Sequence, residues 1–246
     1  MSVRVTFLGA GDAFNAGARC HASYLVAANG TRCLLDCGAT ALMALKRTRT
    51  TAAEIDTVFL SHLHGDHFGG VPFLLLESVY ESQRQRPLTV VGPPGTRDRL
   101  DELYRCLYRE LACRPLPFEL RYVEVAPGEP TCFGSIDLLP FRVPHQEKEI
   151  SLGLRLSVDG RTILYSGDTG WTEELVKQSQ GTDLFICECC YFETRVDFHL
   201  DYPRITENAP RFGCRRLVLT HIGREVLAHR SEITHELAHD GLVVEL

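Results

Sequence analysis

Three histidines and one aspartate stand within six residues, in the sequence HLHGDH at residues 62–67, and the segment Ser61–His67 directly follows an apolar run at residues 57–60. A short apolar run bounded by polar residues is typical of a buried strand. His62 and His64 are two residues apart, so both rings can turn toward one point, whereas Asp66 and His67 follow the Gly65 turn and can face a second. Imidazole and carboxylate groups together bind zinc, iron or manganese. The segment therefore predicts a metal site at the end of a strand.

Strand-like runs recur along the chain and are separated by helical patterns. Runs of Val, Ile, Leu, Phe or Tyr predict strands at residues 3–8, 23–27, 32–36, 57–60, 88–91, 118–124, 136–141, 152–158, 162–166, 184–187, 217–220 and 242–245. Helical spacing predicts helices at residues 39–47, 71–83, 96–109, 172–178 and 225–239, the fourth of them capped by Thr172. No linker rich in Gly, Ser or Pro divides the chain. We expect one domain over residues 1–246, of the α+β class, with two sheets packed face to face and helices outside.

The later polar motifs fall in an order that resembles the metallo-β-lactamase superfamily. HLHGDH is similar to its HxHxDH signature, and His145 in VPH, Asp168 in GDTG and His221 after residues 217–220 resemble its later ligands. The resemblance covers essentially the whole chain and implies a four-layer αββα sandwich with two divalent metal ions, for which zinc is favoured over manganese or iron. By the same resemblance the first ion is held by His62, His64 and His145, the second by Asp66, His67 and His221, and Asp168 lies between the two. Asp36 resembles an aspartate that supports the ligand loop from behind.

Such a pair of ions has a clear chemical use. Two dications a few ångströms apart lower the pKa of a shared water, so that a metal-bridging hydroxide forms near neutral pH. The same ions draw charge from a phosphoryl or carbonyl oxygen as it develops in the transition state. We therefore expect a metal-dependent hydrolase.

Within the superfamily, the ribonuclease Z-like phosphodiesterase branch is the most similar. The opening FLGAGDAFNAGARCHASYLV resembles its Gly-rich first turn, and VGPPG at residues 91–95 resembles its loop before a helix. Glu188, and His199 within DFHLD, resemble a pair in which the histidine protonates the departing oxygen and the glutamate orients its ring. We expect catalysis from Asp66, His199 and Glu188. A surface histidine and a structural acid remain the alternative interpretations of the last two residues.

Differences from the pattern of that branch, together with the net charge, indicate the substrate class. The 91–95 loop has no lysine, the stretch between His145 and Asp168 is short, and the net charge is −6. Because affinity for a phosphate backbone comes mainly from Lys and Arg, a small or short phosphodiester is favoured over RNA. The alternatives are hydrolysis of a carboxyl ester, lactone, thioester or lactam at the same dinuclear site, and a non-enzymatic metal-binding protein of cofactor biosynthesis.

Composition predicts the remaining properties. No apolar run approaches 18 residues, and the first residues lack the features of a signal peptide, so we expect no membrane association and a cytoplasmic location. The ten cysteines form no paired CxxC, and we expect reduced, mostly buried thiols. Arginines between residues 84 and 121 alternate with acidic residues, which favours a solvated mixed-charge face. A homodimer through an exposed apolar helix face stays open.

Two other motifs are weaker. HELAH at residues 235–239 matches the zinc-protease pattern HExxH but stands seven residues from the C-terminus, so a solvated terminal helix is the better interpretation. Gly9 and Gly11 follow a strand as in a dinucleotide-binding loop, but Phe14 replaces the third glycine. His21 and His229 are interpreted as non-functional.

Overall fold

The computed structural model describes residues 2–246, and its two seven-stranded sheets pack against each other. The first sheet has the order β14 (Val243–Glu245), β1 (Arg4–Gly9), β2 (Ser23–Ala28), β3 (Thr31–Leu35), β4 (Thr57–Phe59), β5 (Leu88–Gly92) and β6 (Leu120–Glu124). The second has the order β13 (Glu236–Leu237), β12 (Leu217–Thr220), β11 (Leu184–Glu188), β10 (Arg161–Tyr165), β9 (Ser151–Val158), β8 (Ile136–Val143) and β7 (Thr131–Phe133). In each sheet, hairpin-connected antiparallel strands precede parallel ones.

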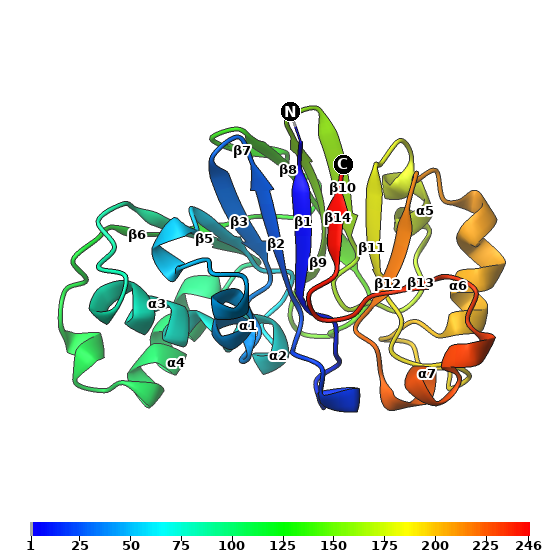
Figure 1. Cartoon of the computed structure of the whole chain (residues 1–246), viewed down its shortest axis with the longest axis horizontal. Coiled ribbons are helices and arrows are strands. Elements are labelled where there is room, and N and C mark those ends of the chain that lie inside the picture. Colours follow the sequence, from blue (N-terminus) through cyan, green and yellow to red (C-terminus); the bar gives the residue numbers. More distant parts are fainter. Residues whose placement is uncertain (1) are drawn as a thin grey trace.

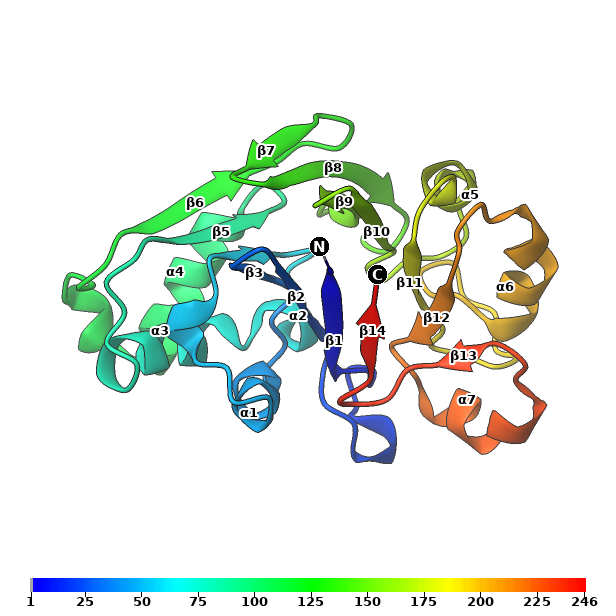
Figure 2. The ribbon, with the colours of Figure 1, turned by 45° about the horizontal axis from the view of Figure 1, so that its top comes forward.

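Helices cover the outer face of each sheet (Figures 1 and 2). The first sheet is accompanied by α1 (Ala41–Arg47), α2 (Gly65–Phe68), α3 (Val71–Tyr80) and α4 (Thr96–Leu107). The second is accompanied by α5 (Glu173–Ser179), α6 (Tyr202–Asn208) and α7 (Arg224–Ala228). Short 3-10 turns lie at Ala16–Ala18, Ala52–Glu54, Leu111–Cys113, Ala209–Arg211 and Arg230–Glu232.

Three hydrophobic clusters hold the layers together. Phe7 and Leu154 belong to the cluster between the sheets, Leu74 to the cluster under α3, and Leu175 and Ile205 to the cluster under α5 and α6. Burial of apolar area on both faces of each sheet requires this layering, because a sheet bounded by helices on one side and a sheet on the other has no wet face. The expected αββα sandwich of the α+β class is therefore confirmed.

The direction of the strands brings the polar motifs to one edge. Strands β3, β4 and β5 run parallel, so the segments after β3 and β4 leave from the same edge of the first sheet. In the second sheet β10, β11 and β12 are parallel, and β8 points the same way because it is two antiparallel pairings from β10. Asp36, the HLHGDH segment, His145, Asp168 and His221 each follow one of these strands.

Several local predictions hold. Thr172 is the N-cap of α5 and accepts a hydrogen bond from the backbone N–H of Glu174. The predicted strands match observed strands within two residues at each end. Two short strands, β7 and β13, and two short helices, α2 and α6, were not predicted. The two-residue β13 and the four-residue α2 are too short to show a period of their own.

The helix predicted over residues 225–239 is wrong beyond its first turn. Helix α7 ends at Ala228, a 3-10 turn follows, and Glu236 and Leu237 form strand β13 beside β12. The carboxylate of Glu236 also pairs with Arg216 at 2.7 Å. Backbone pairing with the sheet edge, not intrinsic helix propensity, decides this segment.

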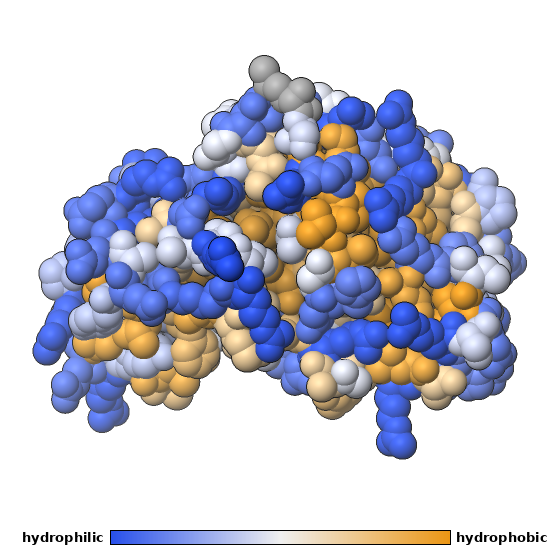
Figure 3. All heavy atoms as spheres, viewed as in Figure 1, coloured by the Kyte–Doolittle hydropathy of each residue, from blue (hydrophilic) through white to orange (hydrophobic). Residues whose placement is uncertain are grey.

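Arg84 and three cysteines also differ from expectation. Arg84 is buried, and its guanidinium donates hydrogen bonds to the carbonyl oxygens of Ala52, Arg86 and Pro87, so it is not part of a solvated face. All ten cysteines are free thiols, as expected, but only six are buried, and Cys106, Cys113 and Cys132 are exposed. Figure 3 shows a mixed surface in which hydrophobic residues gather at the centre of this face, around β1 and β14, and in a smaller area over α3 and α4. Helices α3 and α4 expose Phe73, Tyr80 and Leu107.

Candidate metal centre

Three histidine nitrogens face one another where β4 and β8 end. Nδ1 of His64 lies 3.1 Å from Nε2 of His62 and 3.0 Å from Nε2 of His145. In a tetrahedral zinc site with Zn–N distances of about 2.0 Å, ligand atoms are separated by about 3.3 Å, so this spacing suits one bound ion. The three residues form the first group that could hold a metal.

A second group lies beside the first and contains two carboxylates. Nε2 of His67 lies 3.3 Å from Asp66 Oδ2 and 3.2 Å from Asp168 Oδ2. Nε2 of His221 lies 3.4 Å and 3.3 Å from the same two oxygens. The four residues form a second group that could hold a metal. Asp168 Oδ2 is also 3.8 Å from Nε2 of both His62 and His145, so this oxygen lies between the two groups.

Buried atoms without hydrogen-bond partners support metal binding. Oδ1 of Asp168 is buried and has no hydrogen-bond partner in the described part of the chain, and the buried Nε2 of His67 faces only the carboxylate oxygens of the same group, without a hydrogen bond of good geometry. An unpaired buried polar atom is costly, and a metal ion supplies the missing partner. The set of imidazole nitrogens and carboxylate oxygens suits zinc, iron or manganese. The residues present therefore fit the divalent ions that the sequence predicts.

The protonation of the two groups differs. Burial lowers the pKa of His62, His64 and His145, so these rings are neutral and offer lone pairs. Burial is the largest influence on His67 and His221 and opposes their charge, but the nearby carboxylates together, with Asp168 first among them and Asp66 next, outweigh it and raise the pKa of both. Because a ligating imidazole is neutral, metal binding at the second group releases protons.

Asp36 fixes His67 from behind. Its Oδ2 accepts hydrogen bonds of 2.7 Å each from His67 Nδ1, Ser61 Oγ and Tyr165 Oη, and its Oδ1 accepts one from the backbone N–H of Ser61. The bond to Nδ1 orients the ring so that Nε2 faces the carboxylates of the second group, where it can offer its lone pair to a metal ion once the ring is neutral. Asp36 therefore has the supporting position that the sequence predicts, with a left-handed backbone at φ 56°.

Tyr165 and Gln146 were not predicted from the sequence. Tyr165 ends β10 in an apolar run, and nothing in that run distinguishes it from an ordinary core residue. Nε2 of the Gln146 side chain lies 3.1 Å from Nε2 of His64, and its position directly after His145 is the only signal that could have identified it. If His64 binds a metal through Nδ1, its Nε2 carries the proton. The side-chain amide of Gln146, with its oxygen and nitrogen exchanged, then accepts a hydrogen bond from this Nε2–H.

Glu188 and His199 form a hydrogen-bonded pair. Oε1 of the fully buried Glu188 accepts hydrogen bonds from the Thr169 backbone N–H at 2.6 Å and from His199 Nδ1 at 2.9 Å. Burial lowers the pKa of His199, but the Glu188 carboxylate outweighs it and raises this pKa to about 9. The ring is thus an imidazolium at neutral pH. The neighbouring carbonyl of Phe198 accepts a hydrogen bond from His145 Nδ1 at 2.8 Å, which directs Nε2 of His145 toward His64.

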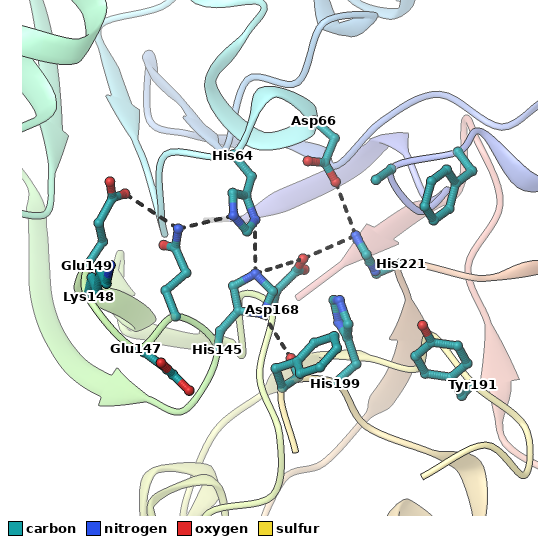
Figure 4. Close-up of a pocket in the computed structure, with 14 residues that line it drawn as sticks. His64, Asp66, His145, Glu147, Lys148, Glu149, Asp168, Tyr191, His199 and His221 are labelled. Carbon is teal, nitrogen blue, oxygen red and sulfur yellow. Dashed lines mark hydrogen bonds and ion pairs between the residues drawn. The ribbon is translucent and has the colours of Figure 1, made fainter. Parts of the chain in front are cut away.

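These side chains line one cavity of about 580 Å³, which we call the metal-facing cavity (Figure 4). His64, Asp66, His145, Asp168, His199 and His221 all contribute to its wall. Glu147, Lys148 and Glu149 lie on the side of His64 and His145, and Tyr191 lies on the side of His199 and His221. A small polar molecule that enters this cavity would meet both groups of candidate metal ligands and the His199 imidazolium.

The weaker motifs do not reach this centre. Nδ1 of His235 lies 3.1 Å from the hydroxyl of Tyr202, Glu236 pairs with Arg216, and His239 Nδ1 lies near the carbonyl of Asp240. The HELAH residues thus have separate partners, and the zinc-protease interpretation stays rejected. His229 pairs with Glu232, away from the cavity.

The fold and the site define the class of metallo-β-lactamase-fold hydrolases related to ribonuclease Z. The chain is 30% identical to the ribonuclease Z of Lachnoclostridium phytofermentans over 246 aligned positions, which cover 78% of each protein. Its structure is similar to the metallo-β-lactamase fold protein YhfI from Bacillus subtilis, with a TM-score of 0.81 and 21% identity over 100% of this chain and 99% of that chain. It is also similar to the short form of human tRNase Z, with a TM-score of 0.78 and 26% identity over 98% of each chain. Within this class, the family described as Anti-Pycsar protein Apyc1 matches residues 3–240, and the chain belongs to that family.

Proposed function

We propose that this protein is a metal-dependent phosphodiesterase that acts on a small or short phosphodiester. The observation that carries the proposal is the position of His199. It is hydrogen-bonded to the buried Glu188 and lines the same cavity as the two groups of candidate ligands. An alkoxide leaving group needs a proton as the P–O bond breaks, and an imidazolium at this place can donate it.

For the metals we propose two divalent ions, with zinc favoured over manganese or iron. His62, His64 and His145 would hold the first, Asp66, His67 and His221 the second, and Asp168 both. When bound, the ions supply an activated water and neutralise charge on the phosphoryl oxygens. Asp66 thereby contributes to catalysis as a ligand.

The remaining steps belong to the chain. His199 holds the proton on the ring nitrogen that does not contact Glu188 and passes it to the departing oxygen. Glu188 keeps the ring charged and oriented, because its other bond, from the Thr169 N–H, fixes the carboxylate itself. The segment of Phe198 and His199 serves both metal binding and proton transfer. The backbone carbonyl of Phe198 orients the candidate ligand His145, and the next side chain, His199, is the proposed general acid.

The size and charge of the cavity favour a small substrate over RNA. A cavity of about 580 Å³ is in the range for small-molecule sites. Of the three charged side chains on its outer wall, Glu147 and Glu149 are acidic and only Lys148 is basic. A folded RNA needs many phosphate contacts from Lys and Arg, and the net charge of −6 opposes this.

A panel of substrates tests the proposal. Purified protein loaded with zinc or manganese is assayed on bis(p-nitrophenyl) phosphate, p-nitrophenyl phosphate and a lactone. We expect turnover of the diester, loss of turnover on chelation and recovery on adding metal back. Turnover of the lactone alone would establish the acyl hydrolase instead. Bound metal without turnover of any substrate would favour the non-enzymatic metal-binding protein.

Among residues 2–246, no helix combines the length and apolar character that crossing a bilayer requires.

Three further expectations stay predictions. A cytoplasmic location, a homodimer and a single domain over residues 1–246 await cell fractionation, sedimentation and limited proteolysis.

A further inference from the structure

A second cavity, of about 390 Å³, adjoins the metal-facing cavity, and we call it the side cavity. Phe14 and Tyr191 line both cavities, so these two aromatic side chains stand at the junction. The other lining residues are Asp12, Cys190, Thr194, Gly223 and, from α7, Arg224, Glu225 and Ala228. The proposed hydrolysis uses none of these side chains.

Phe14 is held in an exposed position by a braced turn. Its side chain is 87% exposed, which forgoes about 1.5–3 kcal/mol of burial free energy. The turn beneath it is ordered, because Oδ1 of the buried Asp12 accepts hydrogen bonds from the N–H groups of Phe14 at 3.2 Å and Ala16 at 2.9 Å. Gly11, at the base of the turn, forms a bridge with Ile222, the residue after His221. The turn that carries the exposed ring is thus paired with the segment that follows the candidate ligand His221.

Tyr191 is also fixed by its neighbours. Its backbone N–H donates to Leu200, and its carbonyl accepts from the N–H of Tyr202. Its ring centroid lies 6.0 Å from that of His199, in an edge-on arrangement. The next three backbone N–H groups donate to Glu225 of α7, which also lines the side cavity. Both junction rings therefore belong to rigid segments that also carry site residues.

The two ends of the metal-facing cavity differ in chemistry. Figure 4 shows Tyr191 on the side of His199 and His221, opposite Glu147, Lys148 and Glu149. A phosphodiester centred on the candidate ligands would place one ester substituent toward the charged end and the other toward the aromatic end. The aromatic end continues into the side cavity, which has room for a ring.

We propose that the side cavity binds a flat aromatic substituent on one ester oxygen of the phosphodiester, packed against Phe14 and Tyr191. This inference rests on the proposed function and deepens it by naming the substituent. Aromatic rings gain from stacked or edge-on contacts beyond the area that they bury. Arg224 is exposed and has no side-chain hydrogen bond or ion pair within residues 2–246, so its guanidinium is free to lie over the bound ring.

Paired substrates test the role of Phe14. Methyl p-nitrophenyl phosphate and bis(p-nitrophenyl) phosphate both release p-nitrophenolate, so one absorbance reading follows both reactions. The difference in their intrinsic reactivity is the same for all variants. The ratio of their kcat/KM values therefore reports the subsite when the native protein is compared with Phe14→Ala. We expect Phe14→Ala to lower the preference for the diaryl ester about tenfold, with Phe14→Tyr retaining it. Tyr80→Ala, an exposed aromatic residue on α3, is the control.

A binding measurement separates this proposal from the proposed function. Calorimetric titration of the zinc-loaded protein with phenyl phosphate and with inorganic phosphate needs no turnover. We expect Phe14→Ala to weaken phenyl phosphate about tenfold and to leave inorganic phosphate unchanged. Selective loss of phenyl phosphate binding without any turnover would keep the subsite and reject the phosphodiesterase. An equal affinity of Phe14→Ala and native protein for phenyl phosphate would overturn the subsite, whatever the turnover.

Discussion

The hydroxyl of Tyr165 on the second sheet donates a 2.7 Å hydrogen bond to Oδ2 of Asp36 on the first sheet. The same oxygen accepts from His67, so one carboxylate connects the two sheets and orients a candidate metal ligand. Each sheet contributes ligands of its own, and their mutual position depends on how the sheets pack. This contact between the layers therefore bears directly on the geometry of the metal centre.

Removing the Tyr165 hydroxyl should weaken metal binding without unfolding the protein. In Tyr165→Phe the ring still fills its place, but Asp36 loses one of its donors, and His67 is held less firmly. We expect zinc affinity to fall about tenfold, as measured by competition with a chromophoric chelator. Tyr122→Phe is the matched control, because Tyr122 also donates to an aspartate, Asp101, but lies far from the site on β6. Equal affinities for the two variants would show that the link between Tyr165 and Asp36 does not position the ligand.

Substitution of His199 should separate catalysis from metal binding. His199→Ala removes the proposed acid and leaves all seven candidate ligands in place. We expect turnover of a phosphodiester with an alkoxide leaving group to fall about 10²–10⁴-fold while the metal content stays that of the native protein. Metal content is measured by mass spectrometry. A p-nitrophenolate leaving group needs less help from an acid, so its loss should be smaller, and unchanged turnover of both esters would remove the role of His199.

Glu225 should make the loop before His199 sensitive to acid. Burial disfavours the charge on its carboxylate, but the hydrogen bonds from residues 192–194 outweigh burial and lower its pKa below the usual 4.5. A carboxyl group whose pKa is lowered by folding stabilises the fold above its unfolded pKa, and this contribution is lost as the pH falls through the folded pKa. We expect exchange of the amide hydrogens of residues 192–194, corrected for intrinsic rates, to speed up as the pH falls through the lowered pKa of Glu225.

The variant Glu225→Gln gives the control for this pH dependence. It should show fast exchange of the same amides at every pH, because a neutral side chain cannot hold three N–H donors equally well. Glu232→Gln, which changes an exposed neighbour paired with His229, should behave as the native protein. Slow exchange of the amides at residues 192–194 in Glu225→Gln would contradict the proposed anchor.

Arg84 should be a stabilising residue despite its charge. Arg84→Leu leaves the carbonyl oxygens of Ala52, Arg86 and Pro87 without their donor, and we expect the free energy of unfolding to fall by about 3 kcal/mol in urea titrations. Arg86→Leu removes an exposed ion pair with Asp56 and should cost less than about 1 kcal/mol. If Arg84→Leu lowered the free energy of unfolding no more than Arg86→Leu does, Arg84 would behave as an ordinary surface residue, and its proposed stabilising role would be wrong.

Much of the site could be predicted because its residues follow strands in short, distinctive motifs. HLHGDH and GDTG place histidines and aspartates at strand ends, and parallel strands bring such ends to one edge. The contacts that support them could not be predicted. Tyr165 lies in an ordinary apolar run, and its role depends on an aspartate 129 residues away in the chain. The error at residues 225–239 has the same origin, because β13 exists only where β12 offers it an edge.

The sequence by itself determined that strands alternate with helices and that a metal-binding type of motif follows the strand at residues 57–60, because periodicity and residue type are local properties. The αββα fold and the remaining candidate ligands were implied by the resemblance of several motifs, in order, to the metallo-β-lactamase superfamily. Only the tertiary structure decided that Tyr165 joins Asp36 across the two sheets, that the carbonyl of Phe198 orients His145, and that Phe14 and Tyr191 meet at the junction of two cavities. Those relationships depend on the packing of two sheets and on loops from distant parts of the chain, and hydrogen-bond geometry of this kind has no signature in the local pattern of residues.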